Sequence, residues 1–147
     1  MNTEILKYNP DYKNEVLSVW EKSVLATHLF LSEEDFVEIK LMLQDFDFAQ
    51  LDVFLLSVDQ KIVGFIGISD QKIEMLFLDP DYIGKGYGKQ LVDYAFGAFD
   101  VNLVDVNEQN TNAIKFYEKI GFETYDRKEL DDMGKNYPIL KMKLKTA

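Results

Sequence analysis

Cysteine is absent from this 147-residue sequence, and only one histidine and three prolines occur in it. Without cysteine the chain has no disulfide, no thiolate zinc site and no cysteine nucleophile, and we expect no metal site. No run approaches the roughly 20 apolar residues that cross a bilayer, and no secretory leader, linker or repeat is apparent. We therefore expect one domain over residues 1–147, located in the cytoplasm, without membrane contact, and either monomeric or homodimeric.

Positive charge is also scarce, because 16 Lys and Arg stand against 26 Asp and Glu and give a net charge of −10. Nucleic acid binding requires Lys or Arg at the phosphates, so this balance disfavours nucleic acid and favours cationic partners. Residues 82–92 are an exception, since Lys85 and Lys89 lie there without any acid. This window is suited to an anion.

Hydrophobic spacing predicts helices at four places in the chain. A first helix opens at Pro10 and carries Val16, Val19, Trp20 and Val24, and a second follows the N-cap Ser32. Two more are expected later, from Lys89 to Phe99 and from the end of Asn107–Asn112 to the stop at Gly121.

Apolar and β-branched runs predict the strands of a sheet. The expected strands are Glu4–Tyr8, Asp52–Val58, Lys61–Ser69, Lys72–Leu78, Val101–Val106, Glu123–Glu129 and Ile139–Leu144. The turn at Asp59-Gln60 indicates a hairpin, whereas a strand, helix, strand unit over 72–106 normally pairs its strands in parallel. We therefore predict an α/β fold with a mixed, mostly antiparallel central sheet flanked by helices and containing one parallel strand pair.

Three glycines, Gly84, Gly86 and Gly88, alternate between a predicted strand and a predicted helix. Such positions let backbone N–H groups converge, and the positive end of the next helix adds to an anion site suited to phosphate. A Walker loop does not fit, because Gln90 follows Gly88-Lys89 where Ser or Thr is required. A dinucleotide fingerprint fits poorly because of its different glycine spacing, although Asp105 lies where a ribose-binding acid would occur.

The segments LFLDPDYIGKGYGKQLVDYAF and VDVNEQNTNAIKFYEKIGF together resemble the GNAT superfamily of N-acetyltransferases. The second segment matches the family pattern N-x-x-A-x-x-[LF]-Y-x-x-x-G-F from Asn110 to Phe122. The first segment departs from the family's R/Q-x-x-G-x-G/A loop, because Ile83 stands where Arg or Gln is usual. SVLATHLFLS and DDMGKNYPIL resemble a branch of small bacterial members.

The resemblance implies transfer of the acetyl group of acetyl-coenzyme A by direct attack to a primary amine, of a small molecule or of a protein lysine or N-terminus, with the parallel strands splayed around the cosubstrate. The alternative is a non-catalytic module that senses coenzyme A. The residues expected to bind the cosubstrate are Leu76, Phe77, Leu78, Ile83, Gly84, Lys85, Gly86, Tyr87, Gly88, Lys89, Asn107, Asn110 and Tyr117.

Catalysis needs an acid for the leaving thiolate and a base for the amine. Tyr117 matches the position of the family's acid, and a phenol with a pKa near ~10 can protonate a thiolate. Glu74 and His28 are the two candidates for the base, and each also has an ordinary structural interpretation. Asp131, Asp132 and Tyr137 are expected at the acceptor mouth, where acidic groups would favour a cationic amine.

Overall fold

The computed structural model describes residues 2–145 of the chain. The helices are α1 (Lys13–Thr27), α2 (Glu33–Asp45), α3 (Tyr87–Phe99) and α4 (Thr111–Ile120). The strands are β1 (Thr3–Lys7), β2 (Asp52–Val58), β3 (Lys61–Ser69), β4 (Lys72–Leu78), β5 (Leu103–Asn107), β6 (Phe122–Lys128) and β7 (Ile139–Leu144). None of the described helices is long and apolar enough to span a membrane.

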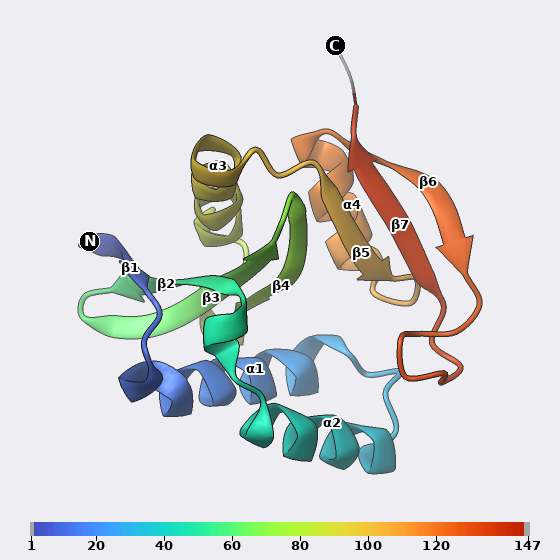
Figure 1. The fold of residues 1–147 in the computed structure, drawn as a ribbon, viewed down its shortest axis with the longest axis horizontal. Coiled ribbons are helices and arrows are strands. Elements are labelled where there is room, and N and C mark those ends of the chain that lie inside the picture. Colours follow the sequence, from blue (N-terminus) through green and yellow to red (C-terminus); the bar gives the residue numbers. More distant parts are fainter. Residues whose placement is uncertain (1, 146–147) are drawn as a thin grey trace.

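The strands form one seven-stranded sheet in the order β1-β2-β3-β4-β5-β7-β6. All neighbouring pairs are antiparallel except β4 and β5, which are parallel. Helices α1 and α2 lie on one face of the sheet and α3 lies on the other, while α4 stands beside β5 and β6 (Figure 1). This architecture confirms the predicted fold class.

Two hydrophobic clusters hold these layers together, one on each face. The first joins α1 and α2 to the sheet through side chains such as Trp20, Leu55 and Phe65. The second joins α3 and α4 to the opposite face, through side chains such as Leu91, Ile66 and Tyr117. Alternate residues of β2 and β3 point to opposite faces, so these strands are buried on both sides.

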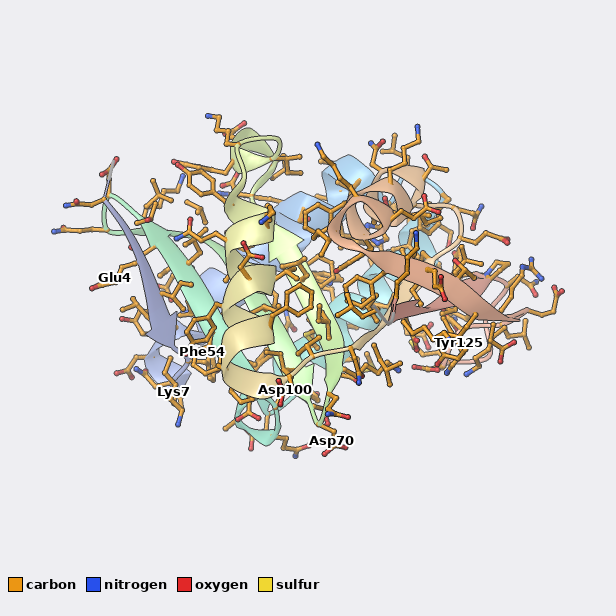
Figure 2. All side chains as sticks on the ribbon, turned by 90° about the horizontal axis from the view of Figure 1, so that it is seen from above. Glu4, Lys7, Phe54, Asp70, Asp100 and Tyr125 are labelled. Atoms are coloured by element: carbon orange, nitrogen blue, oxygen red, sulfur yellow. The ribbon has the colours of Figure 1, made fainter. Side chains whose placement is uncertain are left out.

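Seen from the α3 side, the sheet runs from β1, with Glu4 and Lys7, to β6, with Tyr125 (Figure 2). Phe54 of β2 lies beside α3 in this view and packs its ring against Tyr94 and Phe99, with centroids 4.9 and 5.5 Å apart. These contacts fix α3 on the first half of the sheet. The other half carries α4.

A β-bulge at Glu74 lies in β4, the strand at which the half of the sheet formed by β1 to β4 meets the half formed by β5, β7 and β6. Ile68 of β3 is opposite Ile73 and Gly67 is opposite Met75, so Glu74 is the extra residue of β4. A bulge bends a strand and increases its twist. The parallel pairing of β4 with β5 includes only Lys72↔Leu103 and Ile73↔Val104, and therefore stops where the bulge begins.

Four strands have the predicted bounds, whereas other elements begin or end elsewhere. Pro10 opens a 3-10 turn capped by the Asn9 side chain, and α1 proper begins only at Lys13. Helix α3 begins at Tyr87 instead of Lys89, because Gly86 adopts the left-handed conformation that ends the loop. The remaining strands, β1, β5 and β6, are displaced by one or two residues from the predicted ranges.

Candidate active site

A cleft of about 250 Å³ lies beside the diverging end of β4, between α1 and α4. We call it the β4 cleft, and its lining comes from three elements far apart in the sequence together with the loop before α3. The lining residues are Ser23, Thr27, His28, Leu76, Phe77, Leu78, Ile83, Gly88, Asn110, Asn112, Ala113, Phe116 and Tyr117. A larger hollow of about 680 Å³ between α1 and the β1 edge contains none of the predicted site residues.

The glycine loop leads from the end of β4 into α3. Gly84 and Gly86 have φ angles of +82° and +85°, a backbone conformation that residues other than glycine rarely adopt. The N-cap residue of α3 is Gly86, which has no side chain to form a cap hydrogen bond. The positive end of α3 at this residue is suited to an anion.

Gly88 has a different role from the other two glycines. A Cβ placed there would lie 3.2 Å from Cζ of Phe116, so the absence of a side chain lets α3 approach α4 closely. Gly88 and Phe116 both line the β4 cleft. Gly84 and Gly86, by contrast, have no atom within 4 Å of such a Cβ, and only their backbone conformation requires glycine.

The two lysines of the loop, Lys85 and Lys89, both have contacts within the protein. Lys85 Nζ lies 5.5 Å from the centroid of the Tyr82 ring, and Lys89 forms an ion pair with Asp93 at 2.8 Å. Ile83 is 47% exposed and its side chain lines the cleft. The loop thus offers main-chain groups and an apolar contact at the position where the family usually has Arg or Gln.

Tyr117 lies on α4 with its ring 6% exposed, packed edge-on against Phe116 and Phe122 at centroid distances of 5.1 and 5.6 Å. Burial raises the pKa of its phenol, which therefore stays protonated at neutral pH. Within residues 2–145 no hydrogen bond occupies its hydroxyl, and no fully buried side-chain oxygen there lacks a partner. The hydroxyl is therefore not fully buried, and Tyr117 lines both the β4 cleft and a smaller cavity toward β5.

His28 follows the last residue of α1, and its backbone N–H donates to Val24 O at 2.8 Å. Its ring is half-buried near Phe30 and Phe77, with centroids 5.3 and 6.4 Å away. Burial lowers the pKa of the imidazole, so the ring is neutral at pH 7 and able to accept a proton. His28 lines the β4 cleft and each of the smaller cavities that adjoin it.

Glu74 lies on the bulge of β4 and its side chain is 36% exposed. It lines a cavity of about 170 Å³ toward β5, which also includes His28 and Tyr117. Lys72 Nζ lies 4.0 Å from Glu74 and 2.6 Å from Asp105. Asp105 thus belongs to this ion cluster and does not lie beside the glycine loop, as a ribose-binding acid would.

Asn110 is the N-cap of α4, where its side-chain oxygen accepts from the N–H of Ala113 at 3.2 Å. The same side chain lines the β4 cleft, so capping and ligand contact are compatible at this position. Asn107, at the end of β5, lines the two smaller cavities instead of the cleft itself.

A second cavity, of about 160 Å³, meets the β4 cleft at His28 and Phe77. We call it the aromatic cavity. Its lining residues are Trp20, Val24, His28, Phe30, Leu31, Ile39, Phe77, Asn107, Asp131 and Tyr137. Asp131 and Tyr137 line this cavity, whereas Asp132 forms an ion pair with Lys128 at 3.1 Å.

The loop between β6 and β7, residues 129–138, contacts the start of α2 next to the aromatic cavity (Figure 1). We call this loop the β6–β7 segment. The Tyr137 hydroxyl donates to Asp35 Oδ2 at 2.5 Å and accepts from the N–H of Ser32. Lys135 Nζ forms ion pairs with Asp35 at 2.9 Å and Glu38 at 2.7 Å. The two flanking segments that resemble the small bacterial branch are therefore in contact in space.

The sequence pattern missed several residues that the fold places at the cleft. Ser23, Thr27 and Phe116 line it, and Trp20, Phe30 and Ile39 line the aromatic cavity. A helical spacing of four joins Ser23 to Thr27, which directly precedes the single histidine. That spacing was the available signal for Thr27.

A bulged strand that separates from its parallel neighbour, followed by a glycine loop and a helix N-terminus, is typical of α/β transferases that bind an extended, phosphate-bearing cosubstrate. Comparisons with known proteins identify the family within this class. The family described as acetyltransferase (GNAT) domain matches residues 49–124, and the chain belongs to it.

Two curated relatives are similar over most of their length. Peptidyl-lysine N-acetyltransferase YjaB of Salmonella typhimurium is 39% identical over 87% of this chain and 88% of its own. Its namesake from Escherichia coli is 42% identical over 87% of each chain.

Solved structures share the fold. The apo-form of YjaB from Escherichia coli superimposes with a TM-score of 0.91 and 35% identity over the whole of both chains. An N-acetyltransferase from Thermoplasma acidophilum in complex with coenzyme A has a TM-score of 0.80 at 23% identity, covering 99% of this chain and all of its own. The chain is thus an acetyl-CoA-dependent N-acetyltransferase, which confirms the predicted enzyme class and cosubstrate over the non-catalytic alternative.

Proposed function

We propose that the acceptor is the side-chain amine of a lysine in a protein or peptide. The observation that carries this proposal is the aromatic cavity, which shares His28 with the β4 cleft and has Asp131 among its lining residues. At about 160 Å³ it is smaller than the roughly 300–1,000 Å³ typical of pockets for whole small molecules, and it suits one slender side chain. The names of the two relatives, peptidyl-lysine N-acetyltransferases, support the same acceptor.

Charge supports a cationic acceptor. The chain has a net charge of −10, Asp131 lines the aromatic cavity, and Glu33 lines a neighbouring cavity between α1 and α2. Opposite charge raises the encounter rate more than the final affinity.

We also place the reaction in the cytoplasm. The lack of cysteine agrees with a reducing compartment, and so does the use of acetyl-CoA as cosubstrate.

We assign the acetyl-CoA contacts to Leu76–Leu78, the Gly84–Lys89 loop and Asn110. The outward backbone of β4 beyond the bulge has no β5 partner, so its N–H groups can bind the pantetheine and hold the oxyanion that forms at the thioester carbon. The helix end at Gly86 would bind the pyrophosphate.

The catalytic groups act in sequence during direct attack. His28 takes a proton from the lysine amine while the nitrogen bonds to the acetyl carbon. The C–S bond then breaks, and Tyr117 gives its proton to the thiolate of coenzyme A. We prefer His28 to Glu74 as the base because His28 lines both the cleft and the aromatic cavity, whereas Glu74 lines only the cavity toward β5.

The experiment uses an N-terminally blocked peptide with one lysine, acetyl-CoA and the whole protein. We expect mass spectrometry to locate the acetyl group on the lysine nitrogen, and the matched peptide with norleucine in place of lysine to remain unmodified. Free polyamines and an aminoglycoside serve as competitors. Acetylation of these small amines, with none on the lysine peptide, would overturn the proposed acceptor.

The choice of base has its own pair of variants. His28→Gln should lower kcat/KM by about 100-fold or more and remove the acidic limb of its pH profile, as loss of a general base does. Glu74→Gln should leave that limb in place. The opposite result, with the limb lost only in Glu74→Gln, would move the role to the carboxylate.

A further inference from the structure

Two short contacts connect the end of α1 to the imidazole of His28. The Thr27 hydroxyl oxygen lies 2.7 Å from the carbonyl oxygen of Ser23, one turn earlier in the helix. The same oxygen lies 2.8 Å from Nδ1 of His28. A hydroxyl has one proton to donate and lone pairs to accept with.

Only one arrangement of protons makes both contacts favourable. A carbonyl oxygen can only accept, so the Thr27 hydroxyl must donate its proton to Ser23 O. If the hydroxyl instead donated to Nδ1, two lone-pair-bearing oxygens would face each other at 2.7 Å without a proton between them. Thr27 therefore accepts a hydrogen bond from Nδ1–H of His28.

From this we propose that Thr27 is a positioning residue that holds His28 in the Nδ1–H tautomer, with the lone pair on Nε2 directed to the substrate. The proposal rests on the proposed role of His28 as the base. A neutral imidazole carries its proton on one nitrogen only, so fixing it on Nδ1 leaves Nε2 as the acceptor. In water histidine favours the opposite tautomer, with the proton on Nε2, which cannot serve as a base at that atom.

The surroundings of the ring agree with this assignment. No hydrogen bond of the described chain occupies Nε2, and no fully buried side-chain nitrogen in residues 2–145 lacks a partner, so Nε2 of this cavity-lining residue is not fully buried. Phe30 and Phe77 limit rotation of the ring. The backbone bond from His28 N–H to Val24 O fixes the position of its Cα.

The hydrogen bond to Thr27 persists through the proton transfer. When Nε2 takes a proton from the amine, the ring becomes an imidazolium that still donates from Nδ1 to the same oxygen. No side chain has to turn during the step, as a preorganised site requires. The titratable groups that line the cavities with His28 are Glu33 from α2, Glu74 from β4, Asp105 from β5, Tyr117 from α4, and Asp131 and Tyr137 from the β6–β7 segment.

The chain is well suited to a direct test because His28 is its one histidine. Nitrogen NMR of the ¹⁵N-labelled protein reports the tautomer of that single ring, in the absence of any substrate. The wild-type spectrum should show a protonated Nδ1 and an unprotonated Nε2 at a pH where the ring is neutral. An Nε2–H tautomer in the wild type would overturn the proposal, whatever the variants do.

Thr27→Val and Thr27→Ser form the matched pair. Valine keeps the β-branched shape without the hydroxyl, so we expect the Nδ1–H population to fall and kcat/KM to drop by about 5- to 10-fold, the effect of one neutral hydrogen bond on an equilibrium. The acidic limb of the pH profile should move to lower pH, because the imidazolium loses an acceptor. Serine retains the hydroxyl and should restore the wild-type tautomer and most of the activity.

The outcomes separate this inference from the proposed function. A wild-type tautomer and wild-type kcat/KM in Thr27→Val refute the positioning role, even when His28→Gln is inactive. Full activity in His28→Gln refutes the choice of base, while the NMR measurement still decides the tautomer. A loss of activity in Thr27→Val that serine does not restore, with no change of tautomer, would assign Thr27 a packing role only.

Discussion

Replacing Tyr117 by phenylalanine removes one oxygen atom from the centre of the proposed site. The ring contacts with Phe116 and Phe122 remain, because both are made by the ring itself. The lost hydroxyl has no hydrogen-bond partner within residues 2–145, so no buried group is left unpaired by its removal. The free energy of unfolding should therefore change by less than about 1 kcal/mol.

The effect on catalysis should be much larger. General acid catalysis contributes roughly 100- to 10,000-fold, which corresponds to about 3 to 5 kcal/mol of activation free energy. Because Tyr117 lies against the sulfur end of the proposed pantetheine path, the loss should appear in kcat, with little change in the Kd of acetyl-CoA. Burial raises the pKa of this phenol, so deprotonation of Tyr117 should not limit the wild-type rate near neutral pH.

The assay is the release of free thiol from acetyl-CoA with the lysine peptide as acceptor. The protein contains no cysteine, so the thiol signal has no background from the enzyme. Single-turnover measurements show whether chemistry or product release limits the rate. A phenylalanine variant that retains wild-type single-turnover rates would refute Tyr117 as the acid and leave water as the proton donor.

Further predictions concern the glycine loop, the α2 contact and the acceptor. Gly86→Ala should weaken acetyl-CoA binding at least tenfold and destabilise the fold by about 1 kcal/mol, because Gly86 has a φ of +85°. The control Gly97→Ala lies in open space within α3 and should leave binding unchanged while it stabilises the fold by ~0.5–1 kcal/mol. Calorimetry measures the binding of acetyl-CoA and thermal melts measure the stability of both variants. Hydrogen bonds from Tyr137 and Lys135 hold the pKa of Asp35 at about 2, below its ordinary 3.8. The stability that this carboxylate contributes is therefore present above pH ~4 and is lost as the pH falls toward 2. Tyr137→Phe should raise the pKa of Asp35 in a carboxyl NMR titration, and an unchanged pKa would contradict the hydrogen bond. The KM of a lysine peptide should rise with salt as screening shortens the field to ~8 Å, and a salt-independent KM would argue against steering by the net negative charge of the chain.

Most of the sheet could be predicted because its signals are local. The runs 52–58, 61–69 and 72–78 alternate or stay apolar over their full length, and the Asp59-Gln60 turn falls between two of them. The glycine loop and the Asn110 to Phe122 pattern are likewise contiguous in the sequence. These local signals were sufficient for the fold class, the family and the enzyme class.

The bulge at Glu74 could not be predicted, because it arises from a mismatch in register between β3 and β4. Glu74 itself looked like an ordinary residue at the start of a strand. The displacement of β4 that opens the cleft therefore had no signature in the sequence of β4 alone. It is a property of the strand pair.

The aromatic cavity was missed for a similar reason. It forms where the end of α1 meets the segment before β7, and residues such as Phe30 and Tyr137 are more than a hundred positions apart. Their pattern in the sequence is that of ordinary apolar packing. The contact of Thr27 with His28 is local, but its importance follows only from the fold, which places His28 and Tyr117 in the lining of one cleft.

We propose that acetyl-CoA binds along the unpaired edge of β4, between the glycine loop and His28. Backbone-amide hydrogen exchange with and without acetyl-CoA measures this directly. We expect slower exchange at Leu76–Leu78 and at the first turn of α3, with no change along β1 at the far edge of the sheet. Unchanged exchange at Leu76–Leu78 under saturating acetyl-CoA would contradict it.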